Sequence, residues 1–223
     1  MIKTKERELK QIYAMVVIVF LVFLLIPIVL LLGKSFEGGG GVSLEHYADV
    51  AGGKGFAAAF GRSIFVSCVS AVLTTALAFV LAYTIHYTNV PGGLKKFIRL
   101  AAVVPMLLPT ITYGFAIIYS FGRQGFITGM IGHQMFEIYG FYGLLLGYVI
   151  YTLPISFMLI LNTMSFIDKK FMIVSRIMGD SPLKTFLGTV IRPLLGTLAA
   201  SFVQCFFLCF TDFGIPASVG GQY

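Results

Sequence analysis

The side chains that most often perform chemistry are few in this sequence and lie far apart. The cysteines and histidines are Cys68, Cys205, Cys209, His46, His86 and His133. The cysteines lie inside apolar runs, the histidines lie in different expected loops, and neither set has the spacing of metal ligands. A membrane enzyme would need acids, histidines or serines that converge on one face, and none converge here. We therefore expect no catalytic residue, no metal and no cofactor.

One acidic residue, Asp212 in "CFTDFGIP", lies close to an apolar run. An ionisable side chain inside a bilayer costs about 2.5 kcal/mol or more, so such residues usually have a function. Gly214 and Pro216 follow at once and indicate that the helix ends here, near the outer interface. Asp212 is either a hydrated carboxylate at a helix end or a gate residue on a transport pathway.

The elements that hold these residues belong to a membrane protein. Only 11% of the 223 residues are charged and the mean hydropathy is +0.93, whereas soluble domains carry about 25% charged residues. The net charge of +7 does not indicate a nucleic-acid-binding protein, because the basic residues are scattered between apolar runs and form no patch. The expected fold is an all-α polytopic bundle.

Five apolar runs are long enough to cross about 30 Å of hydrocarbon at 1.5 Å per residue. They are Tyr13–Leu32, Ser63–Ile85, Ile98–Phe121, Phe141–Met164 and Pro193–Phe210. The first run is too long for the apolar part of a signal peptide and no small-residue cleavage site follows it, so we expect it to be retained. The expected parts are an anchor at 1–33, a flexible glycine-rich outer loop at 34–61 and a core at 62–223.

The distribution of Lys and Arg predicts a cytoplasmic N-terminus. With this orientation twelve basic residues lie inside and four lie outside, as the positive-inside rule requires. The four outer residues are Lys34, Lys54, Arg62 and Arg123. The segment 165–192 then lies at the cytoplasmic surface.

Three prolines lie inside the expected spans, namely Pro105, Pro109 and Pro154. Each frees a backbone carbonyl that must find another partner, and the hydroxyls of Thr110, Thr112, Thr152 and Ser156 lie close enough in sequence. These prolines either bend packing helices or shape a pathway that opens and closes. Small residues four apart in the second run, Ser67 with Ala71 and Ala78 with Ala82, predict close helix packing.

The segment 165–192 predicts two short helices joined at an elbow. Asp168 is an expected N-cap, and Ile167, Phe171, Val174 and Met178 form an apolar stripe. Gly179 occupies the position of a left-handed C′ residue, after which Ser181 and Pro182 start a second helix as N-cap and first residue. Without a nucleophile–base pair or a ligand cluster, this elbow has the features of a docking element.

This helix–Gly–helix segment resembles the "EAA" loop of ABC-importer permeases, whose pattern is E-A-A, three residues and Gly. In "IVSRIMGDSPLKTFLGTVIRP", Ser175 matches the second Ala, Gly179 the Gly, Pro182 a common Pro and Phe186 the usual aromatic. The sequence departs at Ile173, where the family has Glu, and at Pro193, one residue later than usual. "VVPMLLPTITYG", "YTLPISFML" and "FTDFGIPASVGG" are similar to other permease segments, and the last is nearest to permeases for ferric iron and phosphonates.

The resemblance implies a type I importer permease, with the elbow Ser175, Gly179, Pro182 and Phe186 as the ATPase-coupling loop. Its implied partners are an ABC ATPase in the cytoplasm, a solute-binding protein outside and a second permease module or copy, in a bacterial inner membrane. The implied cargo is a small solute such as ferric iron, phosphonate or a polyamine. Modules of this subtype have six spans, so five spans predict the N-terminal part of a longer permease or a truncated one.

An ion-coupled secondary transporter is the alternative function. Such transporters usually need several intramembrane acids or broken-helix ion sites, and Asp212 is the one acid available near a span. Co-purification of an ATPase separates the two classes.

Overall fold

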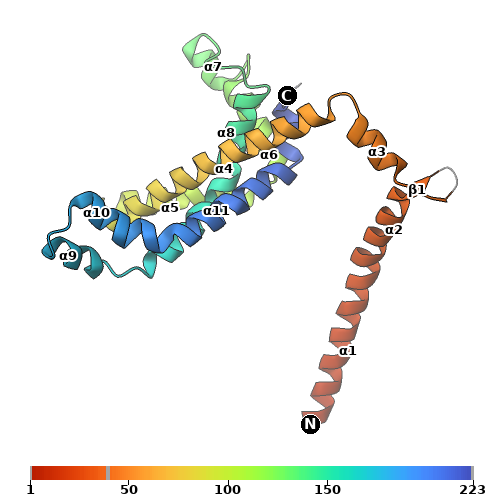
Figure 1. Ribbon diagram of the computed structural model, residues 1–223, viewed down its shortest axis with the longest axis horizontal. Coiled ribbons are helices and arrows are strands. Elements are labelled where there is room, and N and C mark those ends of the chain that lie inside the picture. The colour runs from red at the N-terminus through yellow and green to blue at the C-terminus, as the bar shows by residue number, and fades with distance from the viewer. Residues whose placement is uncertain (1, 39–40, 222–223) are drawn as a thin grey trace. The chain divides into compact units, whose positions relative to one another are not determined.

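The computed structural model describes residues 2–38 and 41–221, and nearly all of their regular structure is helical (Figure 1). By its contacts the chain divides into two units, Met1–Ala58 and Ala59–Tyr223.

A long helix dominates the first unit. It consists of α1 (Ile2–Phe20), the π turn η1 (Leu21–Leu25) and α2 (Ile26–Ser35). Its segment Glu8–Ser35 is long and apolar enough to cross a membrane, and its side chains there are exposed. Such an unburied apolar helix requires lipid or partner helices around it.

The expected flexible loop after this helix contains regular structure. Strands β1 (Glu37–Gly38) and β2 (Gly41–Val42) pair antiparallel, and α3 (Glu45–Gly52) follows. The prediction was wrong for the two glycines that pair in this ladder, while Gly39 and Gly40 lie outside the described residues. The ladder is only two residues long on each side.

The second unit is a helical bundle, and its first helix, α4, begins three residues before the unit boundary, at Phe56. Its elements are α4 (Phe56–Tyr87), α5 (Gly92–Val103), the 3-10 turn η2 (Val104–Leu107), α6 (Thr110–Phe121), α7 (Phe126–Ile131), α8 (Phe141–Ser165), α9 (Lys170–Ile177), α10 (Pro182–Phe186), the π turn η3 (Leu187–Ile191), α11 (Arg192–Thr211) and α12 (Gly214–Val219). The described chain has four helices that could cross a membrane, or five if one sharply bent pair counts as a span. This agrees with the expected polytopic bundle.

That bent pair replaces the third expected span. Ile98–Phe121 was predicted as one kinked helix, but the chain turns by 114° between Leu107 and Thr110. Pro105 and Pro109 cause the break together, because each removes a donor from the helical ladder and Pro109 also keeps Leu108 extended. Two prolines four residues apart leave no complete helical turn between them.

Both π turns precede a proline at the same distance. Leu21–Leu25 ends two residues before Pro27, and Leu187–Ile191 ends two residues before Pro193. A proline ring clashes with the carbonyl four residues earlier, and a π turn there widens the helix. The chain therefore passes each proline without breaking, and α10, η3 and α11 form one helix from Pro182 to Thr211.

Two apolar clusters form the core of the bundle, one at each end. The first cluster contains Val66, Tyr113, Ile117, Ile138, Leu144, Tyr148, Cys209, Ile215 and Val219. The second contains Ala78, Ala82, Ile85, Ala102, Phe157, Ile160, Met164, Val190 and Leu194. The small residues of α4 are buried, as their spacing predicted, so the helices approach closely there.

Hydroxyl groups join three helices at the level between these clusters. Thr74 of α4 contacts Thr152 of α8 at 3.0 Å between their hydroxyl oxygens. Ser201 of α11 forms hydrogen bonds with Thr75 and with Ser156. We call these five residues the hydroxyl belt. In a bilayer such bonds hold helices together, because apolar contact with a neighbouring helix gains little over contact with lipid.

Candidate functional site

The elbow between α9 and α10 has the geometry that its sequence predicts. Gly179 has φ +84°, the left-handed conformation expected of a C′ glycine. The N–H of Gly179 donates to the carbonyl of Arg176, and the N–H of Asp180 donates to that of Ser175. These two bonds form a Schellman motif, which ends α9 at a defined place.

The second helix starts with a capped turn. The Ser181 hydroxyl accepts the N–H of Lys184 at 3.3 Å, and Pro182 is the first residue of α10. The two-helix prediction is therefore confirmed at this elbow. The expectation that the fifth span begins at Pro193 is wrong, because α10 continues through η3 into α11. The Asp168 carboxylate accepts the N–H of Lys170, the first residue of α9.

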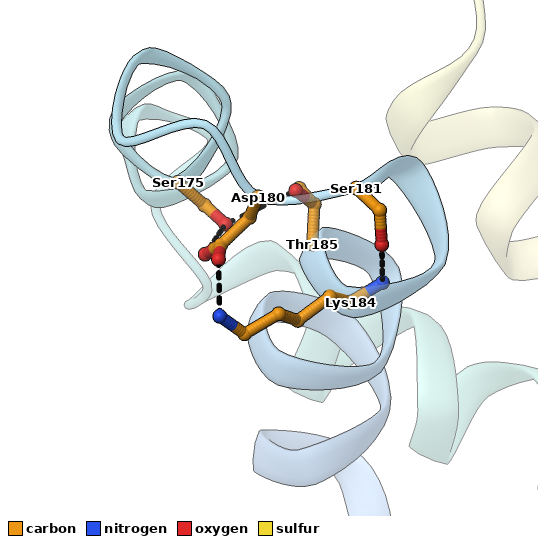
Figure 2. Close-up of polar contacts among 5 residues, drawn as sticks. All are labelled: Ser175, Asp180, Ser181, Lys184 and Thr185. Atoms are coloured by element: carbon orange, nitrogen blue, oxygen red, sulfur yellow. Dashed lines mark hydrogen bonds and ion pairs between the residues drawn. The ribbon is translucent and has the colours of Figure 1, made fainter.

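Side chains within the elbow hold it closed (Figure 2). Ser175 donates to one Asp180 oxygen at 2.8 Å, and Lys184 pairs with the other at 2.5 Å. The hydroxyls of Ser175 and Thr185 lie 3.0 Å apart, and Thr185 is buried. Hydrogen bonds to Lys184 and to Ser175 lower the pKa of the Asp180 carboxyl, and the bond with Lys184 has a larger effect than the bond with Ser175. Ser175, the residue that matches the second Ala of the family pattern, is thus a polar brace.

The apolar side chains of the elbow are exposed. Phe171, Val174, Ile177, Met178 and Leu183 have between 51% and 80% of their surface accessible. Ile167, Phe171, Val174 and Met178 were expected to form an apolar stripe. Ile167 is half-buried against the second apolar cluster, and the described chain leaves the other three residues uncovered. Contiguous exposed apolar surface on a defined element marks an interaction site.

Phe186 anchors the elbow to the bundle. Its ring meets those of Phe79 and Tyr83 edge-on, at 6.2 and 5.7 Å between centroids. It packs against the second apolar cluster, whereas Ile173, at the position of the family's Glu, is exposed. Phe186 therefore acts as a packing residue here, between the elbow and α4.

The backbone carbonyls that the prolines free do not find the hydroxyl partners that the sequence led us to expect. The hydroxyl of Tyr113 donates to the carbonyl of Pro105, the group that loses its helical donor at Pro109. Sequence analysis missed Tyr113, although a tyrosine one turn after Pro109 was a usable signal. Thr152 donates to Tyr148, and Ser156 bonds with Ser201, so neither serves a carbonyl freed by Pro154.

Asp212 lies at the end of α11, where its Oδ2 accepts the N–H of Ile215 at 2.9 Å and begins α12. It also lines a cavity of about 250 Å³ with Arg62 of α4 and Tyr148 of α8. None of Pro105, Pro109 and Pro154 lines this cavity. The structure thus brings the elbow residues together, whereas of the four expected pathway residues this cavity is lined by Asp212 alone. Within the described ranges, no group of three or more His, Cys, Asp or Glu residues lies close enough to hold a metal ion.

Several known proteins are similar to this chain. It is 24% identical over 215 residues to the ferric transport system permease protein FbpB of Actinobacillus pleuropneumoniae, covering 93% of this chain and 31% of that protein. It is 29% identical to the thiamine transport system permease protein ThiP of Salmonella typhimurium, covering 71% and 30%. It is 26% identical to the probable sulfate transport system permease protein cysT of a Helicosporidium species, covering 74% and 61%. The chain thus matches between 30% and 61% of the length of these three relatives. No protein-family model matches it.

A solved structure shares the fold. A chain of a bacterial ABC transporter involved in the import of the acidic polysaccharide alginate superposes with a TM-score of 0.69 at 14% sequence identity. The match covers 94% of this chain and 76% of the other. At this identity the likeness shows the fold alone.

Proposed function

We propose, from the premise that this chain is a relative of ABC-importer permeases, that it is a transmembrane subunit of an ATP-driven importer. It would provide part of the pathway for a small solute that a solute-binding protein delivers. Relatives named for ferric, sulfate, thiamine and 2-aminoethylphosphonate transport support a small cargo. The sequence has no Walker-type phosphate loop, so ATP hydrolysis would belong to a partner subunit.

The observation that carries this proposal is the braced elbow with exposed apolar side chains. Its backbone is held by the Schellman bonds at Gly179 and the Ser181 cap, and its side chains by the Asp180–Lys184 pair. A rigid apolar projection loses little conformational entropy when a partner covers it. A cytoplasmic ATPase would bind it, with the N-terminus of the chain on the same side of a bacterial inner membrane.

The helix Pro182–Thr211 offers a path for the resulting movement. It starts at the elbow, contributes Ser201 to the hydroxyl belt and ends at Asp212. Movement of the elbow would therefore reach the outer cavity. Asp212, Pro105, Pro109 and Pro154 are our proposed pathway residues, and a second module or a second copy of the chain would complete the pathway.

Substitution of Gly179 tests this proposal. A side chain at Gly179 meets no atom within 4 Å, so its cost comes from the left-handed backbone, about 1 kcal/mol or more. Gly179→Val should reach the membrane in normal amounts but lose ATPase association and solute uptake together. Gly179→Asn should retain both, because Asn tolerates the left-handed conformation.

Gly33→Val is the matched control, since Gly33 in α2 also has open space but has no left-handed φ. Co-purification of an ATPase and uptake of the cognate solute are measured side by side in full-length protein. Retention of both activities by Gly179→Val would contradict the coupling role. Absence of any ATPase from the unmodified protein would contradict the importer function itself.

A further inference from the structure

Basic side chains surround a cavity next to the loop between α4 and α5. The cavity has a volume of about 330 Å³, and His86, Lys95, Lys96, Arg99 and Lys169 contribute to its wall. The other lining residues are Ile85, Leu161 and Ser165. Among the residues that the structure describes, no acidic side chain lines the cavity, so its positive charge is not neutralised from within the wall.

Two of these groups are already fixed in position. Lys95 donates from its Nζ to the carbonyl of Thr88 at 2.8 Å, and Lys169 lies over the ring of Tyr87 at 6.0 Å from its centroid. Nε2 of His86 is buried and has no hydrogen-bond partner among the described residues.

An apolar groove of about 480 Å³ adjoins the basic cavity. Lys96 and Arg99 line both, and beyond them the groove is lined by Leu100, Val103 and Met158. Helix α5, which carries most of these residues, packs against α8 and leaves Leu100 66% exposed. Basic side chains thus lie at the mouth of an apolar channel along the bundle surface.

We propose that this combined site binds an anionic phospholipid of the inner leaflet. The phosphodiester would lie between Lys96 and Arg99, which line both parts, and an acyl chain would lie along Leu100, Val103 and Met158. Basic pockets between membrane helices attract anionic headgroups, and apolar grooves bury hydrocarbon. A soluble phosphate would use the basic part alone, and a zwitterionic lipid would not neutralise it. The leaflet assignment rests on the orientation in the proposed function, whereas binding itself does not.

Native mass spectrometry of the full-length chain in detergent, titrated with phosphatidylglycerol, tests the proposal. Lys96→Gln with Arg99→Gln should weaken binding about thirtyfold, from the general strength of basic contacts with anionic membrane surfaces. Both side chains are exposed, so the protein should still fold. Lys10→Gln with Lys170→Gln removes the same charge elsewhere and should bind as the unmodified chain does.

Three further arms identify the ligand. Phosphatidylcholine with the same acyl chains should bind much more weakly, and inorganic phosphate should not displace the lipid. Leu100→Asn should lower affinity for phosphatidylglycerol while the basic residues remain. Equal binding of both lipids, displacement by phosphate, or equal loss in the control variant would each overturn the lipid site. These measurements do not depend on co-purification of an ATPase, so a failure of the lipid proposal can be told apart from a failure of the proposed importer function.

Discussion

At the scale of residues, the Asp180 carboxylate joins the two helices of the elbow. Asp180 accepts the Ser175 hydroxyl with one oxygen and pairs with Lys184 through the other. The ABC-importer family pattern has a Glu seven residues earlier, where this chain has the exposed Ile173. The carboxylate of this contact therefore comes from a residue immediately after Gly179, within the elbow itself.

The lowered pKa of Asp180 predicts an acid-sensitive elbow. Because the pKa is lower in the folded chain than in the unfolded chain, the stabilisation is complete above the usual carboxyl range. It is lost as the pH falls through the lowered folded value. Hydrogen exchange of residues 175–185 should therefore accelerate at acid pH, beyond its intrinsic pH dependence.

Asp180→Asn should show this faster exchange already at neutral pH and lose the extra acid dependence. Asp168→Asn is the control, because Asp168 lies outside the Asp180 network and contacts the N–H of Lys170 instead. An unchanged acid response in Asp180→Asn would show that another group causes it.

The elbow was predictable from sequence because its rules are local. A glycine stop, a serine cap and a first-turn proline act within about five residues of each other, and each matches its observed role. The bond from Tyr113 to Pro105 also spans few residues, but it depends on a chain reversal that the sequence did not indicate. The contact between Thr74 and Thr152 joins segments 78 residues apart, so no local rule could give it.

Close packing of a short helix is the main feature at the scale of elements. Helix α12 contacts α6 and α8 through positions without side chains. A Cβ at Gly114 would lie 2.3 Å from the Cβ of Ser218, and one at Gly147 would lie 2.7 Å from Ile215. Real carbon atoms do not approach so closely, so these glycines set the distance between the helices.

Gly114→Ala should therefore separate α6 from α12 and destabilise the bundle by about 1–3 kcal/mol. Adding Ser218→Gly should recover part of this loss, because it removes the atoms that the new methyl group meets. Thermal unfolding in detergent measures both effects. Gly129→Ala, where a Cβ meets nothing within 4 Å, should change little. Equal stability of Gly114→Ala and the unmodified chain would contradict this packing.

Hydropathy predicted which segments are helical but not where helices break or continue. Prolines follow both α5 and η3, yet Pro105 with Pro109 causes a 114° bend and Pro193 lies within a continuous helix. The second proline of the pair is one cause of this difference, and the local chain geometry is another. A π turn precedes Pro193, whereas a 3-10 turn and an extended residue lie between α5 and α6. These choices depend on the packing around them.

Orientation in the membrane is the prediction that belongs to the whole molecule. Twelve basic residues on one side against four on the other predict a cytoplasmic N-terminus and elbow. In a variant without its three native cysteines, cysteine at Lys10 or Lys170 should react with an impermeant maleimide only after the cells are opened. Cysteine at His133 should react in intact cells. The reverse pattern would invert the topology and exclude ATPase docking at the elbow.

The unbroken helix from Pro182 to Thr211 makes this part of the molecule a lever. Its 30 residues extend about 45 Å at 1.5 Å per residue, so a tilt of only about 5° displaces one end by about 4 Å relative to the other. The π turn at Leu187–Ile191 lies near the elbow end of this helix, so an uninterrupted α-helix follows it as far as Thr211. A small rotation imposed at the elbow would thus arrive at Asp212 as a displacement larger than the diameter of a water molecule.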